Sequence, residues 1–133
     1  MFERVVPGLV GEVETRVDAD KTARHLGSGN VAVFATPEMI RLMERAAVQA
    51  VDHLLPDGYR TVGAHVDVRH LAPTPVGMTV HARAELIQIE GRQLTFRVHA
   101  ADDAETVGEG LHRRVIIDLA RFKERTAAKG DGS

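Results

Sequence analysis

The longest apolar segment of the chain has the spacing of a helix that other elements surround. It begins at Thr36-Pro37-Glu38, which combines a capping hydroxyl, a proline at the first helical position and an acid in the first turn. It ends near Leu55, before Pro56-Asp57-Gly58. At about 100° per residue, one narrow sector is polar, formed by Arg41, Arg45, Gln49 and Asp52. A helix over residues 37–55 with so thin a polar stripe is predicted to be wrapped by the rest of the fold.

Most of the remaining chain alternates between apolar and polar residues, the pattern of half-buried strands. Predicted strands cover residues 9–17, 61–71, 78–89, 93–101 and a last segment that ends near Leu119. The inward positions of the first are Leu9, Gly11, Val13, Thr15 and Val17, and those of the fourth are Leu94, Phe96, Val98 and Ala100. Short turns such as Glu90-Gly91-Arg92 favour antiparallel pairing. The pattern therefore predicts an α+β fold, with one curved antiparallel sheet around one long helix.

Composition narrows the classes of protein that the chain can belong to. Its 133 residues suit a single domain, predicted over residues 1–125, followed by a disordered tail of small and polar residues at 126–133. There is no cysteine, which excludes disulfides and thiolate chemistry. A net charge of −2 and 4% aromatic residues argue against nucleic-acid binding. No secretory start and no long apolar run are present, so we expect a cytoplasmic protein that does not enter membranes.

Three polar residues stand where the pattern predicts apolar ones. Glu44 lies on the apolar side of the predicted helix, where a carboxylate is costly unless it is paired. It is either a functional acid or a flank residue paired with Arg41 or Arg45. His70 continues the face of Val62, Ala64, Val66 and Val68 at the end of its strand, where a histidine is commonly a satisfied structural residue. Thr36 is interpreted first as a helix N-cap, although a capping hydroxyl can also face a cleft.

Other motifs carry weaker signals. His65 and Asp67 share a strand face, but the sequence places no third metal ligand beside them. Gly27-x-Gly29 lacks the preceding strand and the third glycine of a dinucleotide loop. Gly108-x-Gly110 in the last predicted strand indicates a bulge or a close backbone approach. No Gly-x-Ser-x-Gly elbow exists, which excludes an α/β-hydrolase site.

From residue 11 to residue 122 the chain resembles the hotdog-fold thioesterases, and within them the fluoroacetyl-CoA thioesterase-like family. The similar stretches are Val33-Phe34-Ala35-Thr36-Pro37-Glu38-Met39, Leu42-Met43-Glu44-Arg45-Ala46, the segment from Gly63 to Val80, Ile89-Glu90-Gly91-Arg92, and Gly108-Glu109-Gly110-Leu111-His112-Arg113-Arg114. The block His70-x-Ala72-x-Thr74-Pro75-x-Gly77 and the spacing of eight between Thr36 and Glu44 are specific in combination.

The resemblance implies a curved sheet around the helix, a homodimer with a continuous sheet, and acyl-CoA bound at the subunit interface. It implies a catalytic set of Thr36, Glu44 and His70, the residues that the pattern had singled out. It also places Gly63 near the thioester, and we add Phe34, Arg92 and Arg114 as substrate-binding candidates, the arginines for the CoA phosphates. No metal or other cofactor is implied, since coenzyme A is part of the substrate.

The predicted function is hydrolysis of an acyl-CoA thioester to a carboxylic acid and free CoA. Glu44 would act either as a general base or as a nucleophile, with Thr36 orienting the reactants and His70 managing protons. One alternative is a non-catalytic acyl-CoA-binding module of the same fold; another is a hydratase, whose long helix-linked acid and histidine motif is absent. The segment Arg24–Phe34 is shorter and poorer in aromatics than the family's lid, which predicts no strong preference for fluoroacetyl.

Overall fold

The computed structural model describes residues 1–130. It contains a mixed set of elements in the order β1 (Val10–Arg16), a 3₁₀ turn (Ala19–Lys21), α1 (Ala23–Leu26), α2 (Thr36–Val51), a second 3₁₀ turn (Asp52–Leu54), β2 (Tyr59–His70), β3 (Thr79–Glu90), β4 (Gln93–Ala101), β5 (Thr106–Asp118) and α3 (Leu119–Gly130). The predicted long helix and every predicted strand are present, with ends that differ by a few residues.

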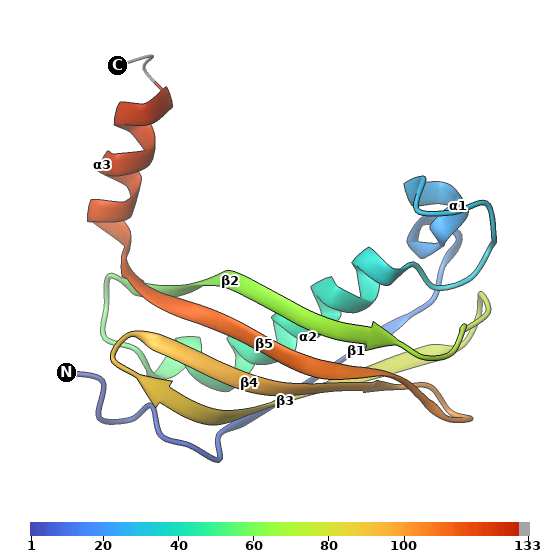
Figure 1. Cartoon of the computed structure of the whole chain (residues 1–133), viewed down its shortest axis with the longest axis horizontal. Coiled ribbons are helices and arrows are strands. Elements are labelled where there is room, and N and C mark those ends of the chain that lie inside the picture. Colours follow the sequence, from blue (N-terminus) through green and yellow to red (C-terminus); the bar gives the residue numbers. More distant parts are fainter. Residues whose placement is uncertain (131–133) are drawn as a thin grey trace.

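The strands form one antiparallel sheet in the order β1-β3-β4-β5-β2. Helix α2 lies along one face of this curved sheet (Figure 1). Strands β3, β4 and β5 follow one another through short connections, whereas β2 returns to pair beside β5 at the edge. This is the predicted α+β hotdog fold, a sheet wrapped around one long helix.

Helix α2 supplies much of the hydrophobic core. Its buried side chains are Met39, Leu42, Met43, Ala46, Ala47, Ala50 and Val51, while Arg41, Arg45 and Gln49 are exposed as the wheel predicts. Strand β1 crosses the helix closely at Gly11, because a Cβ there would collide with the backbone of Ala46 and Ala50. Among residues 1–130, no helix combines the length and the apolar character that a bilayer crossing requires.

The alternation predicted for β1 and β4 is confirmed. On β4, Leu94, Phe96, Val98 and Ala100 are fully buried. The two glycines of β5 mark close approaches, as predicted: a Cβ at Gly108 would collide with Met39 of the helix, and one at Gly110 with the backbone of β2. These contacts bring β2 and β5 tightly onto the first turns of α2.

Strand β2 departs from the predicted alternation. Its register against β5 shifts between Gly63 and His65, so one extra residue is inserted at Ala64. Before this bulge Thr61 and Gly63 face the helix, the opposite of the predicted phase; after it the predicted phase holds, and Val68 and His70 face the helix. A bulge shifts the side-chain period by one residue, so a single strand directs both Gly63 and His70 at α2.

The C-terminal segment corrects the predicted tail. Helix α3 continues to Gly130, so residues 126–130 are helical instead of disordered. The helix projects from the end of β5 and away from the sheet (Figure 1). The rest of that prediction concerns residues 131–133, which lie outside the described residues.

Candidate active site

Thr36 and His70 meet at the N-terminal end of α2. The backbone of Ala35 caps the helix without a side-chain hydrogen bond, so Thr36 is the first helical residue and not the N-cap that the sequence suggested. Its hydroxyl oxygen lies 2.7 Å from Nδ1 of His70. The β2 bulge and the helix start therefore join two of the three predicted catalytic residues.

One nitrogen of His70 is left open. Nε2 is buried and has no hydrogen-bond partner among residues 1–130. Burial lowers the pKa of His70 below its ordinary value near 6.5, an effect that the backbone of Ala72 partly opposes. The imidazole is therefore neutral at pH 7, with one ring nitrogen engaged by Thr36 and the other available to a ligand.

A cleft of about 290 Å³ opens beside this pair. Its lining is largely apolar and consists of Ala23, Ser28, Val33, Phe34, Thr36, His70, Leu71, Ala72 and Pro73. The Phe34 ring is buried and stands edge-on to the His70 ring, with 6.5 Å between ring centroids. Phe34, predicted as a substrate-binding residue, thus helps to form the wall of this cleft.

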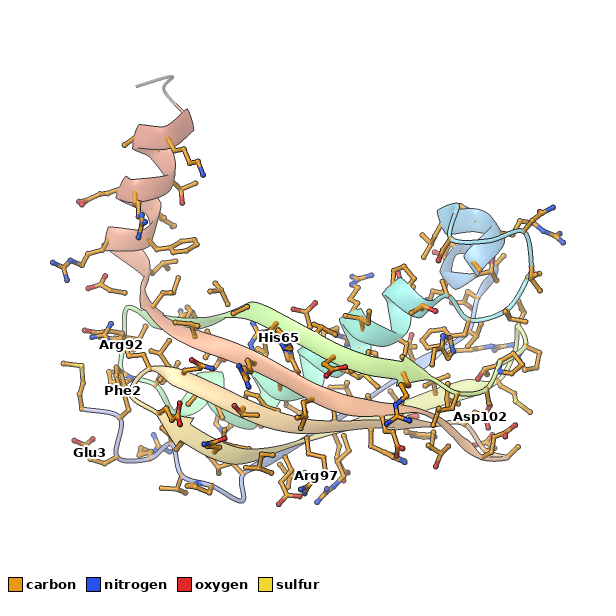
Figure 2. All side chains as sticks on the ribbon, in the orientation of Figure 1. Phe2, Glu3, His65, Arg92, Arg97 and Asp102 are labelled. Carbon is orange, nitrogen blue, oxygen red and sulfur yellow. The ribbon has the colours of Figure 1, made fainter. Side chains whose placement is uncertain are left out.

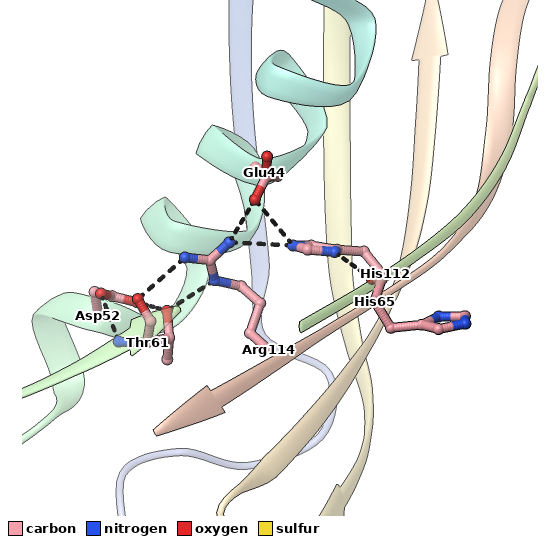
Figure 3. Close-up of polar contacts among 6 residues, drawn as sticks. All are labelled: Glu44, Asp52, Thr61, His65, His112 and Arg114. Atoms are coloured by element: carbon pink, nitrogen blue, oxygen red, sulfur yellow. Dashed lines mark hydrogen bonds and ion pairs between the residues drawn. The ribbon is translucent and has the colours of Figure 1, made fainter. Parts of the chain in front are cut away.

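Glu44 belongs to a second polar cluster, two turns further along α2 (Figure 3). Its Oε2 lies 3.3 Å from Nη1 of Arg114 and 3.9 Å from Nε2 of His112. The side chain is 40% exposed, so the carboxylate is paired on one side and open to solvent on the other. Its partners come from β5 and not from the neighbouring helix arginines; Arg41 pairs with Glu38 instead.

Arg114 is fixed in a single orientation beneath Glu44. Its Nε donates to Oγ1 of Thr61 at 2.8 Å, and its Nη2 donates to the carbonyl oxygen of Thr61 at 3.1 Å. Thr61 in turn donates its hydroxyl to Asp52 at 2.6 Å. Burial lowers the pKa of Arg114, and the Asp52 and Glu44 carboxylates oppose that shift. With 6% of its surface exposed, Arg114 is better placed to hold Glu44 than to contact CoA phosphates.

His112 completes this cluster, and the sequence analysis did not single it out. Its Nδ1 lies 2.8 Å from the carbonyl oxygen of His65 at the bulge, so Nδ1 must carry the proton. Nε2 then accepts from Nη1 of Arg114 at 3.1 Å. Burial lowers the pKa of His112, which keeps it neutral beside the guanidinium. The available signal was its spacing of two from Arg114, which puts both side chains on the same face of β5.

The other predicted substrate-binding residues occupy different places. Gly63 lies against the Glu44 carboxylate, since a Cβ built on it would be 2.6 Å from Oε2. Arg92 lies with Phe2 at the end of the molecule opposite Asp102 (Figure 2), and its guanidinium carbon is 5.5 Å from the ring centroids of Phe2 and Tyr59. Arg92 therefore belongs to neither cluster.

The two clusters do not form one triad within a chain. Thr36 and Glu44 are eight residues apart on a continuous helix, a separation of roughly 12 Å along its axis. A single thioester group is much smaller than this. The chain thus presents two incomplete sets of groups: a hydroxyl with an open imidazole nitrogen, and a paired carboxylate beside a glycine.

Fold and site together define a hotdog-fold acyl-CoA thioesterase, and the comparisons with known proteins agree. Residues 17–120 match the family described as fluoroacetyl-CoA-specific thioesterase. The fluoroacetyl-CoA thioesterase of Streptantibioticus cattleyicolor is 41% identical over 119 residues, which cover 85% of this chain and 86% of that protein. The chain belongs to the fluoroacetyl-CoA-specific thioesterase family.

Solved structures give the same assignment. A structure of the fluoroacetyl-CoA thioesterase FlK superposes with a TM-score of 0.87 at 37% identity, covering 94% of this chain and 97% of that chain. A thioesterase superfamily member from Thermus thermophilus superposes with a TM-score of 0.87 at 28% identity, covering 97% and 98%. A hot-dog-like protein from Thermanaerovibrio acidaminovorans, at 24% identity with a TM-score of 0.88 over 96% and 94% of the two chains, shares the fold.

Proposed function

We propose that the protein hydrolyses acyl-CoA thioesters with Thr36, Glu44 and His70 as its catalytic residues. The observation that carries this proposal is the pair of Thr36 and His70, which both line one cleft, together with the buried Nε2 of His70, which has no hydrogen-bond partner among residues 1–130. A buried polar atom without a partner is costly, and a substrate carbonyl or thiolate sulfur would satisfy it. No resident metal or cofactor is part of the proposal, since coenzyme A arrives with the substrate.

Each residue has a chemical task in this reaction. Water adds to the thioester carbon, the C–S bond breaks, and the products are a carboxylic acid and the CoA thiol. Glu44 either removes a proton from the attacking water or attacks the carbon itself. Among residues 1–130 both of its polar contacts fall on Oε2, which leaves Oε1 for this step. Thr36 orients the thioester, and His70 polarises it or carries the proton to the leaving sulfur.

The separation along α2 supports a homodimer in which each site is shared. Strand β2 pairs only with β5, so its outer edge can continue the sheet into a second copy. A two-fold axis at this edge makes the two central helices antiparallel, so the first turn of one lies level with a later turn of the other. The Thr36 and His70 pair of one protomer would then face Glu44 of the partner subunit across roughly the span of a thioester.

Mixed dimers test this arrangement directly. Thr36→Ala and Glu44→Gln chains, carrying different affinity tags, are co-expressed and the doubly tagged dimer is purified. A shared site leaves one complete pair per mixed dimer, so the activity should return to roughly half of the wild-type value. Mixed dimers as inactive as either parent dimer would place the whole set within one chain. Light scattering should give about twice 14.5 kDa, and a fully active monomer would rule out the shared site.

Release of free CoA thiol separates catalysis from binding. We expect continuous turnover of acyl-CoA by the wild-type protein and binding without turnover by Glu44→Gln. A wild-type protein that binds acyl-CoA stoichiometrically and releases no thiol would be the non-catalytic binding module.

We further propose a cytoplasmic location, which a fold without cysteine supports because it needs no oxidising compartment.

The relative from Streptantibioticus cattleyicolor is named for fluoroacetyl-CoA. We propose that this chain lacks a large preference for that acyl group. The segment between α1 and α2 is nine residues long, Gly27 to Ala35, and carries Phe34 as its single aromatic. Because even a whole methylene is discriminated by only about 10–200-fold, replacing hydrogen with fluorine needs a dedicated device. A kcat/KM for fluoroacetyl-CoA above about a thousand times that for acetyl-CoA would contradict this.

A further inference from the structure

The cleft beside His70 has walls that are held in place before any ligand binds. One wall is the segment before α2 and the other follows β2. Val33 forms a bridge to Pro75, and the backbone N–H of Phe34 donates to the carbonyl oxygen of Thr74 at 2.8 Å. Thr74 is fully buried and donates its hydroxyl to Asp102 at 2.8 Å. The two walls and the β4–β5 turn therefore form one connected unit.

The segments that form this cleft carry apolar side chains that are open to solvent. Four large hydrophobic side chains of the two wall segments and α1 are between 42% and 58% exposed: Leu26, Val31, Leu71 and Val76. Grouped exposure of this kind marks a binding surface more often than isolated exposed residues do. None of the residues that line the cleft is a lysine, arginine, aspartate or glutamate. A charged group inside it would have no partner to offset its desolvation.

The volume of the cleft exceeds what a two-carbon acyl group needs. A water molecule takes about 30 Å³ of liquid volume, so an acetyl group displaces roughly two waters, or about 60 Å³. The cleft of about 290 Å³, which is widely open to solvent, is several times larger than this. A longer hydrocarbon chain would remove the apolar lining of the cleft from water, which is the favourable step.

We propose that the preferred substrates carry uncharged, apolar acyl chains of medium length, which occupy the cleft between Val33, Phe34 and the Leu71–Pro73 segment. This inference rests on the proposed function, because it takes the Thr36 and His70 pair as the place of the thioester. Burial of each further methylene should tighten binding about fourfold, until the chain reaches the end of the cleft. A terminal carboxylate on a chain of equal length should abolish that gain.

The test uses acetyl-, butyryl-, hexanoyl- and adipoyl-CoA. Thiol release by the wild-type protein gives kcat/KM, and calorimetry on Glu44→Gln gives the dissociation constants without turnover. We expect hexanoyl-CoA to have a kcat/KM at least tenfold higher than acetyl-CoA and a dissociation constant at least tenfold lower. Adipoyl-CoA should have a kcat/KM at least tenfold lower than hexanoyl-CoA and a dissociation constant at least tenfold higher. Equal binding of acetyl- and hexanoyl-CoA, or tight binding of adipoyl-CoA, would overturn the inference. Preferential binding of hexanoyl-CoA without turnover would support it and would reject the hydrolytic function instead.

A matched pair of variants tests where the acyl chain of the substrate binds. Ala72→Phe fills the cleft, and Ala120→Phe makes the same change on the exposed face of α3. Ala72→Phe should remove the advantage of hexanoyl-CoA, so that the ratio of its dissociation constant to that of acetyl-CoA changes at least tenfold from the wild-type ratio. Ala120→Phe should leave both unchanged. If Ala72→Phe remains folded by circular dichroism and keeps the full preference for hexanoyl-CoA, the acyl chain lies elsewhere and the inference is wrong.

Discussion

His112 is fully buried and His70 is half-buried, and their ring nitrogens are connected differently. Burial lowers the pKa of each. His112 has both ring nitrogens engaged, one by the His65 carbonyl and the other by Arg114. His70 has only Nδ1 engaged, by Thr36, and its Nε2 is the buried side-chain atom without a partner among residues 1–130. Burial and a lowered pKa therefore do not distinguish the two histidines, whereas the unused ring nitrogen of His70 does, and it is the reason that we propose His70 as a catalytic residue.

The comparison extends to the clusters around them. The His112 cluster is a chain of satisfied hydrogen bonds that ends on one oxygen of Glu44, so it holds a carboxylate in position. The Thr36 and His70 cluster ends in an open cleft. In the proposed reaction one region orients a reactive group and the other receives the substrate. Variants in each should therefore differ in whether they change activity, stability or both.

The largest effect should come from Glu44→Gln, which removes the charge and keeps the shape. Loss of a base or nucleophile should reduce kcat by about 100-fold or more. The fold should persist, because the side chain is 40% exposed and an amide can still accept from Arg114. Thiol release and thermal unfolding measure the two properties. Glu38→Gln, on the first turn of the same helix, is the control; wild-type rates in Glu44→Gln would make Glu44 purely structural.

Gly63→Ala should give the next largest effect. The added methyl group would stand 2.6 Å from Oε2 of Glu44, closer than atoms approach, so the carboxylate must shift away from Arg114. We expect kcat to fall roughly 10–100-fold, in line with misplacement of a catalytic group by about an ångström. Stability should change little, since the displaced atom ends a flexible side chain.

A second substitution checks the cause of that loss. Glu44→Asp shortens the side chain and makes room for the methyl group, so the double variant should be less impaired than the two single effects combined predict. Strictly additive losses would show that Gly63 acts through something other than the Glu44 carboxylate.

His112→Phe should affect stability more than the matching change at an outward histidine. It leaves the His65 carbonyl without its side-chain partner and removes one of the two contacts of the Arg114 Nη1, which keeps Glu44, at a cost of about 1–3 kcal/mol in the free energy of unfolding. His99→Phe, which removes one contact to Thr106 on the outer side of the sheet, should cost about 0.5 kcal/mol or less. Denaturant unfolding compares the two variants. Equal losses in the free energy of unfolding would contradict a role of His112 in positioning Arg114.

The smallest effect is on the pH dependence of stability. The folded-state pKa values of His70 and His112 lie below about 6.5, so the unfolded chain takes up protons first as the pH falls. Their contribution is present above pH 6.5 and declines below it, by well under about 1.4 kcal/mol per pH unit for each histidine, and least for the half-exposed His70. Urea unfolding at pH 7.0 and 5.5 should show this decline, and His112→Phe should make it shallower. An unchanged slope in that variant would mean that His112 does not titrate in this range.

The sequence was sufficient for the elements whose burial follows a simple period. The strand at Gln93–Ala101 buries Leu94, Phe96, Val98 and Ala100 in regular alternation, and both of its edges are paired; the outward Thr95 is also buried. The helix at Thr36–Val51 was predicted equally well, since Arg41, Arg45 and Gln49 mark its polar side. Where a helix or strand continues regularly for several turns or residues, its hydrophobic pattern is sufficient to predict it.

The site was only partly predictable, because the decisive feature has no period. The bulge at Ala64 reverses the phase of Thr61 and Gly63 but not of His70, and nothing in that run of residues announces it. The pairing of Glu44 with Arg114 joins residues 70 positions apart and depends on the register of β2 against β5. Residues 126–130 were misjudged because Ala127 and Ala128 are small, which suggested a tail, yet alanine is also the best helix former.

The position of β2 at the sheet edge also affects the order in which the strands form during folding. The β3–β4–β5 meander closes through short turns and can form early, whereas β2 must find β5 across more than thirty intervening residues. An edge strand with one neighbour is the last to gain its hydrogen bonds and the first to release them. Amide exchange should therefore be faster in β2 than in β4. Strand β2 carries Gly63 and His70. Binding of a second copy or of a substrate should therefore slow the opening of this strand more than that of the other strands.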